Sequence, residues 1–573
     1  MSTFGLNMKA LLLSIIFFII LLPVLNAQTS IDSINKESIY SSPLNIPLIL
    51  AGNFGELRSN HFHSGLDIKT QQREGLMIKT IADGYVSRIK ISPWGYGKVL
   101  YIKHANGVSS VYAHLQKFSP EIEAYIKDEQ YQKKTFTLDL YLSKNKIQVF
   151  KDSLIAYSGN TGGSTAPHLH FEMRKSGSGI ALNPLLFNNS IKDQTPPELE
   201  KIFVYPIEEG SHVNGSEKKV QLTYKKQIDG TYLASPIKTK GSFSFGVKAY
   251  DRQDLAANKN GVYMYSLFKN DTLVSRIHFN EFSFYETRYI NTLIDYEHLI
   301  KYGERILLLY KTPSNPLSVF NAISNKGVVS LNLNEKSTLK LELRDLDGNT
   351  TKLIIPVSAS LENAVVKKKV IKTPYPIYYK NPAHFKFETT SLYFPAKSFY
   401  QNLYLEITEK QDTIKVHNSK VPMHKDFTVS FKPKANPYSE KTYIGYQLYK
   451  NKVVYSPTKR DNGWLSTKSK KLGTYLLQKD SIAPIIKARN FKANQNIKNY
   501  QFLSLSIKDA QSGIKSYNAF LNNQWILMEY EPKNNTITHH ISERTPLTKT
   551  NILEVIVIDM LNNISTYSTT LTK

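Results

Sequence analysis

A regular alternation of apolar and polar residues is the feature that most constrains the fold of this chain. The stretch KSTLKLELRDLDGNTTKLIIPV, residues 336–357, repeats this period of two on both sides of a polar turn. Successive side chains of a strand point to opposite faces of a sheet, so this pattern indicates half-buried strands. The chain is also rich in aromatic residues, with 36 Tyr and 27 Phe. We therefore predict a mainly β fold.

The length of the chain predicts several domains. A chain of 573 residues exceeds one ordinary hydrophobic core, and three to five domains are expected. The apolar fraction of 41% is sufficient for folded domains and argues against disorder.

Two similar strings mark domain boundaries. KDQTPPELEKIFVYP begins at Lys192 and KDSIAPIIKARNF begins at Lys479. In each, Asp and Pro precede a run typical of a strand, and Asp and Pro favour extended or turn conformations over helix. We interpret both strings as the junction between a linker and the first strand of a domain.

The segments that follow these junctions also end alike. Asp345 and Asn349 flank one polar turn, and Asp559 and Asn563 flank another in the same spacing. We interpret the two segments as copies of one β-sandwich type, separated by a further β-rich segment. Their strand pattern resembles that of the immunoglobulin-like (Ig-like) modules of bacterial surface proteins. The expected divisions are a β-sandwich at 195–358, a β-rich domain at 360–479 and a β-sandwich at 481–573.

The N-terminus predicts export. The apolar run ALLLSIIFFIILLPVLNAQTS follows Lys9 and ends in small residues, which is typical of a secretory signal peptide cleaved after Ala27. An uncleaved membrane anchor is the alternative, because the run approaches the length of a membrane span. We expect a signal peptide at 1–27, an N-terminal lead at 28–44 and no stable membrane span after cleavage. The chain has no cysteine and therefore no disulfides, and an exported chain without disulfides suggests a bacterial protein. We expect it in the periplasm or cell envelope, or secreted.

The net charge of +26 raises the question of nucleic-acid binding. The lysines are scattered over the polar positions of strands, and no helix-turn-helix, zinc-finger or RNA-binding signature is present. We therefore expect no nucleic-acid partner. A basic surface of this kind would still attract an acidic polymer such as a bacterial envelope.

Two histidine-containing strings stand out upstream. SNHFHSGLDIKT, residues 59–70, contains His61, His63 and Asp67, and a second string, GNTGGSTAPHLHFEMR, spans residues 159–174. HLHFEMR alternates like a strand, so His168 and His170 face the same way, as a zinc site or an acid–base pair requires. The glycines before it lead through a proline into a strand, which excludes a phosphate-binding loop.

A hairpin is expected between these strings. In GKVLYIKHANGVSSVYAHL the dipeptide Asn106–Gly107 favours a two-residue turn, which would place His104 opposite Ser109. Tyr112 and His114 would then share a polar face that could line a cleft, whereas His104 would point to the core. We assign His114 to the candidate site and His104 to structure.

Taken together, HFHSGLDI, ADGYV, KHANGVSSVYAHL and SGNTGGSTAPHLHFE resemble the lysostaphin/LytM-type zinc metalloendopeptidases, which cut peptide bonds in peptidoglycan. The resemblance covers residues 45–190 and implies an antiparallel β-sheet peptidase domain that binds Zn²⁺. It also implies a role for each matching residue. His63, Asp67 and His170 would be the zinc ligands, and His114 and His168 the catalytic histidines that do not bind the metal. His61 competes with His63 for the ligand role, and the family spacing favours His63.

One departure from the family pattern is a long connection after the Tyr-x-His-Leu element. It begins as a plausible capped helix at Ser119 and Pro120. Residues 118–150, or the β modules, could bind an envelope protein partner, and the expected substrate is peptidoglycan. The leading hypothesis is an exported zinc endopeptidase. The alternatives are a non-catalytic cell-wall-binding regulator of other peptidoglycan hydrolases, and an adhesive surface protein whose β modules carry the function.

Overall fold

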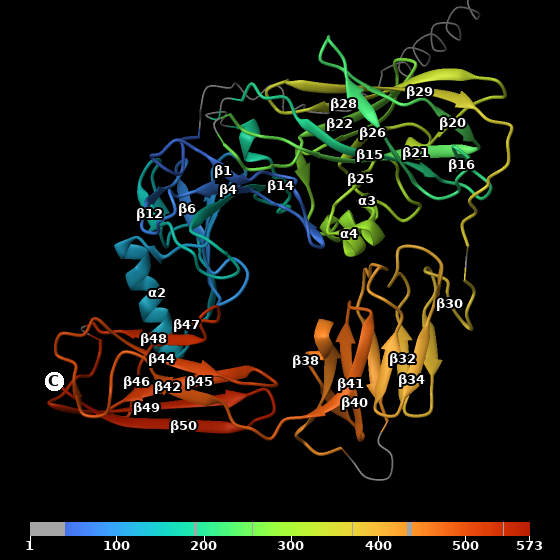
Figure 1. The fold of residues 1–573 in the computed structure, drawn as a ribbon. Helices are drawn as coiled ribbons and strands as arrows, with labels where there is room; N and C mark the ends of the chain where they lie inside the picture. Colours follow the sequence, from blue (N-terminus) through green and yellow to red (C-terminus); the bar gives the residue numbers. More distant parts are fainter. Residues whose placement is uncertain are drawn as a thin grey trace, which may run out of the picture. The chain divides into compact units, whose positions relative to one another are not determined.

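The structure is a computed structural model that describes residues 40–187, 191, 193–254, 256–369, 371–432, 438–542 and 544–573. Strands dominate these residues, which confirms the mainly β prediction (Figure 1). The expected signal peptide at 1–27 and most of the expected lead lie outside the described residues. Within the described ranges, no helix is long and apolar enough to cross a membrane.

The first part of the chain is built on one antiparallel sheet with the strand order β1-β4-β13-β8-β7-β6-β10. Its strands in chain order are β1 (Leu50–Gly52), β4 (Leu66–Lys69), β6 (Gly84–Ile91), β7 (Lys98–His104), β8 (Val108–Ala113), β10 (Leu138–Tyr141) and β13 (His168–Lys175). At its margins lie β11 (Gln148–Val149) and β14 (Ala181–Leu182). Smaller pairings involve β2 (Leu57–Arg58), β3 (His61–Phe62), β5 (Met77–Lys79), β9 (Lys117–Phe118) and β12 (Leu154–Tyr157).

The predicted hairpin is present, but its predicted register is wrong by one residue. Lys103 pairs with Ser109, so the turn has three residues instead of two, with Gly107 at φ +80°. A turn of this length often ends in a glycine with positive φ. The slip moves Tyr112 to the buried face, opposite Leu100, where it is fully buried. The prediction that Tyr112 lines a cleft is therefore wrong.

The predicted helix in the long connection is α2 (Pro120–Lys133), with Pro120 in the first turn. Ser119 precedes it, but its side chain makes no capping hydrogen bond; Glu123 instead accepts from the backbone N–H of Phe118 at 3.0 Å. The outer face of α2 carries ion pairs to the last segment of the chain, between Lys127 and Glu529 at 3.0 Å and between Arg544 and Asp128 at 2.6 Å. The helix is thus in contact with this chain's own C-terminal segment.

The segment at 195–358 contains two sheets in its described residues. The first has the order β17-β15-β21-β25, with β27 beside β21: β15 (Glu198–Pro206), β17 (Val220–Leu222), β21 (Ser242–Tyr250), β25 (Leu307–Leu308) and β27 (Val329–Ser330). The second has the order β16-β20-β29-β28-β22-β23-β26: β16 (His212–Val213), β20 (Ile237–Lys240), β22 (Met264–Lys269), β23 (Thr272–His278), β26 (Phe320–Ile323), β28 (Lys336–Arg344) and β29 (Thr350–Ala359). Further elements are β18 (Tyr224–Lys226), β19 (Tyr232–Ala234), β24 (Glu281–Phe282), α3 (Ile290–Leu293), α4 (Tyr296–Tyr302), and 3-10 turns at Thr287–Tyr289 and Asn325–Gly327.

The segment at 360–479 also has two main sheets in its described residues. One has the order β31-β32-β36-β40-β39: β31 (Ala383–Lys386), β32 (Thr390–Phe394), β36 (Phe427–Phe431), β39 (Lys459–Asp461) and β40 (Trp464–Ser469). The other has the order β34-β35-β41-β37-β38: β34 (Ile407–Lys410), β35 (Thr413–Val416), β37 (Thr442–Gln447), β38 (Val453–Ser456) and β41 (Gly473–Lys479). A short pair joins β30 (Tyr375–Ile377) and β33 (Leu403–Leu405).

The last segment repeats the two-sheet arrangement in its described residues. One sheet has the order β42-β44-β48-β47: β42 (Ile485–Ala488), β44 (Phe502–Lys508), β47 (Glu529–Glu531) and β48 (Thr536–His540). The other has the order β43-β50-β49-β45-β46: β43 (Gln495–Asn496), β45 (Ile514–Leu521), β46 (Gln524–Trp525), β49 (Thr550–Asp559) and β50 (Ile564–Thr572). On β48, His539 is buried and His540 is exposed, so these neighbours face opposite ways.

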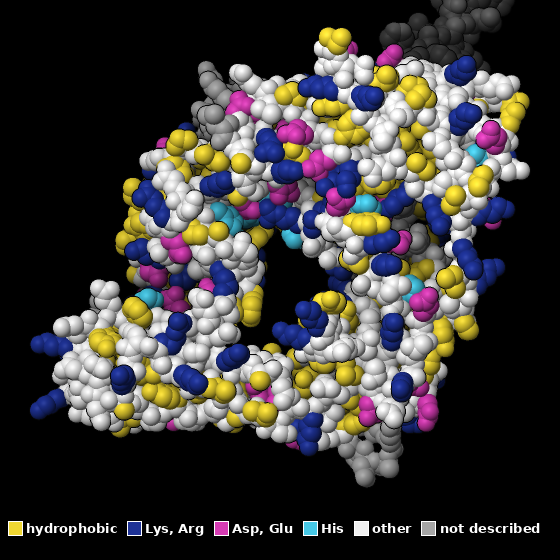
Figure 2. All heavy atoms as spheres, in the orientation of Figure 1, with side chains coloured by type: hydrophobic (Ala, Val, Ile, Leu, Met, Phe, Trp, Pro, Cys, Tyr) yellow, Lys and Arg dark blue, Asp and Glu magenta, His cyan; other side chains and the backbone are white. Residues whose placement is uncertain are grey.

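Alternating side chains form the cores of these segments. In β28, residues Leu339, Leu341 and Leu343 are buried and their neighbours are more exposed, as the sequence pattern predicts. Buried residues of both sheets join in one cluster in the 360–479 segment and in another in the last segment. Basic residues occupy exposed positions of the strands, such as Lys336 and Arg344 in β28. Figure 2 shows Lys and Arg scattered over the visible face.

Candidate metal centre

Three adjacent strands bring the predicted site residues together. Strand β13 lies between β4 and β8, and its residue His170 pairs with Asp67 on one side and with Ala113 on the other. His168 and His170 are two residues apart on β13, so both side chains project to the face that carries Asp67. His63 lies just ahead of β4, and His114 follows β8 directly.

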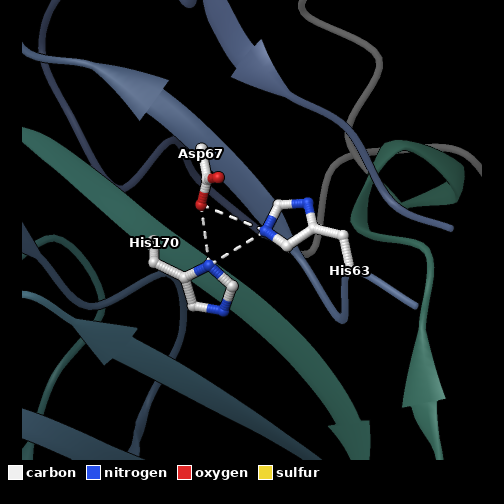
Figure 3. Close-up of side chains that lie close together, drawn as sticks. All are labelled: His63, Asp67 and His170. Atoms are coloured by element: carbon white, nitrogen blue, oxygen red, sulfur yellow. Dashed lines mark hydrogen bonds and ion pairs between the residues drawn. The ribbon is translucent and has the colours of Figure 1, made fainter. Parts of the chain in front are cut away.

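His63, Asp67 and His170 form a compact triangle of ligand atoms (Figure 3). His63 Nε2 lies 3.1 Å from Asp67 Oδ1 and 3.1 Å from His170 Nδ1, and the remaining side, from His170 Nδ1 to Asp67 Oδ1, is 2.8 Å. All three residues are buried. Tetrahedral zinc with bonds of about 2.0–2.2 Å holds its donors about 3.3–3.6 Å apart, so these side chains would hold the metal after shifts of a few tenths of an ångström.

Hydrogen bonds at the far ring nitrogens orient the two histidines. His63 Nδ1 lies 2.7 Å from the carbonyl oxygen of Asn53, which accepts its proton and leaves Nε2 free for a metal. His170 uses the opposite pair of atoms: Nε2 lies 2.8 Å from Glu172 Oε1, leaving Nδ1 for the triangle. Partners of this kind fix the tautomer and ring orientation of metal-binding histidines.

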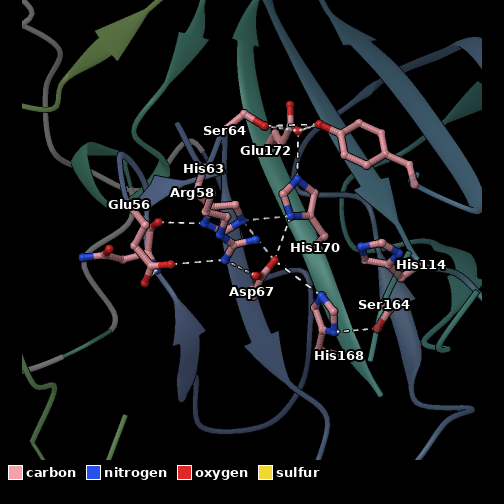
Figure 4. Close-up of polar contacts among 12 residues, drawn as sticks. Glu56, Arg58, His63, Ser64, Asp67, His114, Ser164, His168, His170 and Glu172 are labelled. Carbon is pink, nitrogen blue, oxygen red and sulfur yellow. Dashed lines mark hydrogen bonds and ion pairs between the residues drawn. The ribbon is translucent and has the colours of Figure 1, made fainter. Parts of the chain in front are cut away.

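Glu172 is a functional candidate that the sequence analysis did not identify. It is fully buried, and besides His170 it accepts a hydrogen bond from Ser64 Oγ at 2.7 Å (Figure 4). It also accepts hydrogen bonds from Tyr96 Oη and from Arg174 Nε, the latter at 2.5 Å. The signal was present in the sequence, because Glu172 continues the same alternation that aligns His168 with His170.

The charge state of the site follows from its burial and its carboxylates. Burial alone raises the pKa of Asp67, but hydrogen bonds from His168, His170 and His63 outweigh it and hold that pKa well below its usual range. Burial lowers the pKa of His63 to about 4. Burial also acts to lower the pKa of His170, but Asp67 and Glu172 overcome this and raise it to about 9.

Arg58 balances the remaining charge of Asp67. Its Nη2 lies 2.6 Å from Asp67 Oδ2 and 3.2 Å from Glu56 Oε2 (Figure 4). Because Arg58 contacts Oδ2, the other oxygen of Asp67 is the one that faces the two histidines.

His114 and His168 lie beside the triangle, with their ring centroids 4.8 Å apart. His114 Nδ1 donates to the carbonyl of Thr161 and His168 Nδ1 to that of Ala166, each at 2.8 Å, so both Nε2 atoms are left for other partners. His168 Nε2 lies 3.4 Å from Asp67 Oδ1.

Two features of His114 stand out. Burial lowers the pKa of its imidazole to about 3, so this ring is neutral near pH 7. Its backbone has φ +60°, a left-handed conformation that is uncommon for residues other than glycine and asparagine and is often found at functional sites.

The other two upstream histidines lie away from the triangle. His61 is exposed, with Nδ1 2.8 Å from the carbonyl oxygen of Ser59. His104 is buried between the carbonyl oxygen of Asp83 and the hydroxyl of Ser110, each at 2.8 Å. The structure therefore brings together the five predicted residues, and neither His61 nor His104 joins them.

Comparison with known families gives two matches. Residues 61–133 match the family described as peptidase family M23, and residues 374–480 match a Zu5-like domain. The second match falls on the segment predicted as a β-rich domain at 360–479.

Individual relatives match part of the chain. The chain is 32% identical over 129 residues to a DD-carboxypeptidase/endopeptidase Mpg of Neisseria meningitidis. This alignment covers 22% of this chain and 23% of that protein. It is 28% identical over 115 residues to the murein hydrolase activator EnvC of Escherichia coli, covering 20% of this chain and 21% of that protein. The chain thus spans about a quarter of the length of these curated relatives.

Among solved structures, the catalytic domain of lysostaphin from Staphylococcus simulans is 24% identical. The alignment covers 24% of this chain and 87% of that chain, with a TM-score of 0.18.

Proposed function

Because the chain carries a peptidase domain of family M23, of the lysostaphin/LytM type, we propose that it is an exported zinc endopeptidase that hydrolyses peptide bonds in peptidoglycan. The observation that carries this proposal is the buried triangle of His63 Nε2, Asp67 Oδ1 and His170 Nδ1. Two imidazole nitrogens and one carboxylate oxygen form a three-ligand set of the kind that catalytic zinc uses, with the fourth position left for water or substrate. The assignment of these ligands is part of the proposal.

When bound, zinc would supply a water molecule of lowered pKa and would polarise the scissile carbonyl. The neighbouring histidines would accept and donate protons during the reaction. His114, neutral near pH 7, would offer a free Nε2 as proton acceptor or as hydrogen-bond partner of the substrate. His168, whose ring is oriented by Ala166 and Ser164, would serve the opposite side of the same reacting group.

Location and substrate belong to the same proposal. The N-terminal sequence and the absence of cysteine support export to a bacterial periplasm or envelope. The net charge of +26 supports attraction to an acidic polymer such as a cell wall. The β modules and residues 118–150 stay candidates for an envelope partner.

The proposal is tested by incubating the purified chain with isolated sacculi, with and without a chelator, and analysing the released muropeptides by mass. We expect loss of cross-linked dimers that the chelator prevents and added zinc restores. His63→Ala should abolish cleavage, and His61→Ala is the matched control, because this neighbouring histidine is exposed and outside the triangle.

The alternative is a regulator of other hydrolases. One relative is named as a murein hydrolase activator. Intact dimers in the presence of bound zinc, with stimulation of a separate hydrolase, would favour that function over the endopeptidase.

A further inference from the structure

Two groups of aspartates outside the histidine site hold carboxylate oxygens within 4.8 Å of one another. Neither group takes part in the proposed hydrolysis. The first consists of Asp193, Asp251 and Asp345, and the second of Asp480, Asp509 and Asp559.

The first group, which we call the junction cluster, gathers residues from the start, middle and end of the first sandwich. Asp193 lies five residues before β15, and Asp251 directly follows Tyr250, which pairs with the first residue of that strand, Glu198. Asp345 directly follows β28, and its turn partner Asn349 donates from Nδ2 to the carbonyl oxygen of Asp193 at 2.9 Å. The junction string that begins at Lys192 and the turn between Asp345 and Asn349 therefore lie close together in the structure.

The second group repeats this construction in the last segment. Asp480 lies five residues before β42, and Asp509 follows Lys508, which pairs with Ile485, the first residue of that strand. Asn563 donates from Nδ2 to the carbonyl oxygen of Asp480 at 3.2 Å. The same grouping of three aspartates, with an asparagine hydrogen-bonded to the backbone of the first, thus occurs at equivalent positions of both segments.

A separate observation at the junction cluster points to a ligand. Asn260 is 6% exposed, and its Oδ1 is a buried oxygen with no hydrogen-bond donor among the described residues. Asn260 exchanges both backbone hydrogen bonds with Asp251, at 3.0 and 2.8 Å, so the two side chains project from the same face. Asn260 also lines a cavity of about 50 Å³ together with the three aspartates. A buried acceptor without a donor is costly unless something binds it.

The carboxylates at this cavity accept hydrogen bonds from nearby amides, but these are neutral donors. Among the described residues, no Lys or Arg forms an ion pair with a member of the junction cluster. Arg252, next to Asp251, pairs instead with Glu198 at 3.1 Å. Carboxylates this close are stable together only with a proton or a cation between them.

The donor set selects the class of cation. Every candidate ligand is a carboxylate or amide oxygen, which excludes a preference for zinc or copper and favours a hard cation. Calcium accepts six to eight oxygens in flexible geometry, whereas magnesium demands a near-ideal octahedron. We propose that Asp193, Asp251, Asp345 and the amide oxygen of Asn260 form a calcium site at the junction between the peptidase domain and the first sandwich. This site is independent of the proposed peptidase activity.

The first step of the test is equilibrium dialysis of the full chain with radioactive calcium, in an excess of magnesium. We expect calcium to bind in stoichiometric amount. Absence of binding overturns the proposal, and so does displacement by magnesium as effective as displacement by unlabelled calcium.

Variants locate the ion. Asp251→Asn keeps the size of the side chain and should weaken binding at this site about 10- to 100-fold. Asp271→Asn is the matched control, because this carboxylate lies in the same domain with its side chain 89% exposed. Each variant is compared with the unaltered chain, so any ion bound at the second group contributes equally to both. An unchanged number of bound ions in Asp251→Asn overturns the assignment.

Asn260→Leu distinguishes a calcium-ligand role of Asn260 from a purely structural role. It removes the buried oxygen while keeping the volume, so calcium binding should weaken while the calcium-free protein unfolds at the same or a higher temperature. If calcium binding is unaffected, Asn260 is not a ligand and the proposed site is wrong.

Discussion

His170 and Glu172, two residues apart on strand β13, are joined by a hydrogen bond of 2.8 Å between Nε2 and Oε1, and the carboxylate of Glu172 is fully buried. Glu172 thereby fixes which nitrogen of His170 faces His63 and Asp67. A buried carboxylate behind a ligand also increases the basicity of the imidazole.

Glu172→Gln should lower zinc affinity by about 10- to 100-fold, as is typical when the partner of a ligand is altered. The measurement is competition with a chromophoric chelator at fixed pH. Arg174 loses its partner in this variant, so thermal unfolding is followed in parallel. Glu121→Gln, an exposed substitution on α2, is the control, and equal zinc affinity in both variants would contradict the role of Glu172.

Zinc binding should release a proton. In the metal-free protein the pKa of His170 is about 9, so the ring is protonated at pH 7.5 and must lose that proton before Nδ1 can bind a metal. The pKa of His63 is about 4, so this ring contributes none at the same pH. Zinc affinity should therefore weaken about tenfold per unit as the pH falls below 9.

Calorimetry in buffers of different ionisation enthalpy measures this release directly. We expect more than one proton per zinc at pH 7.5, because His170 and the water bound to the metal both contribute, and about one well above pH 9, where only the water contributes. A binding enthalpy that does not depend on the buffer would show that His170 is neutral before zinc arrives.

Replacing the histidines beside the triangle should separate binding from catalysis. His114→Gln and His168→Gln remove the groups proposed to transfer protons but no proposed ligand, so each should retain zinc while kcat falls about 10²- to 10⁴-fold. Zinc content by mass spectrometry and dimer cleavage are measured on the same preparations, with His61→Gln as control. Loss of zinc from either variant would reassign that histidine to the ligand set.

Tyr112→Phe tests the corrected hairpin register. The hydroxyl of Tyr112 accepts a hydrogen bond from the backbone N–H of Ile81 at 3.1 Å in the core. Its loss leaves that N–H unpaired and should lower the free energy of unfolding by about 1–3 kcal/mol, with cleavage retained. Full stability with lost cleavage would instead support a cleft position for Tyr112.

Local spacing in the sequence was sufficient to bring His168 and His170 to one face, because a strand alternates regardless of its neighbours. The hairpin register was not predictable, because Asn106–Gly107 is compatible with a two-residue or a three-residue turn and tertiary packing decides between them. His114 nevertheless reaches the site, because the strand ends at Ala113 and a left-handed residue follows. Glu172 was overlooked because a glutamate on a strand is ordinarily solvated, and only the fold shows it buried.

The matched aspartates occupy equivalent positions in the two segments. The spacing from Asp to the first strand, and the spacing from Asp to Asn in the closing turn, are the same in both.

The two segments differ in length between their second and third aspartates. Asp251 and Asp345 are 94 residues apart, whereas Asp509 and Asp559 are 50 apart. The longer interval contains β24, which extends the peptidase sheet through β14, and Thr287, which accepts a hydrogen bond from the backbone N–H of Phe62 at 2.8 Å. The extra length of the first segment thus includes residues that attach it to the neighbouring peptidase domain.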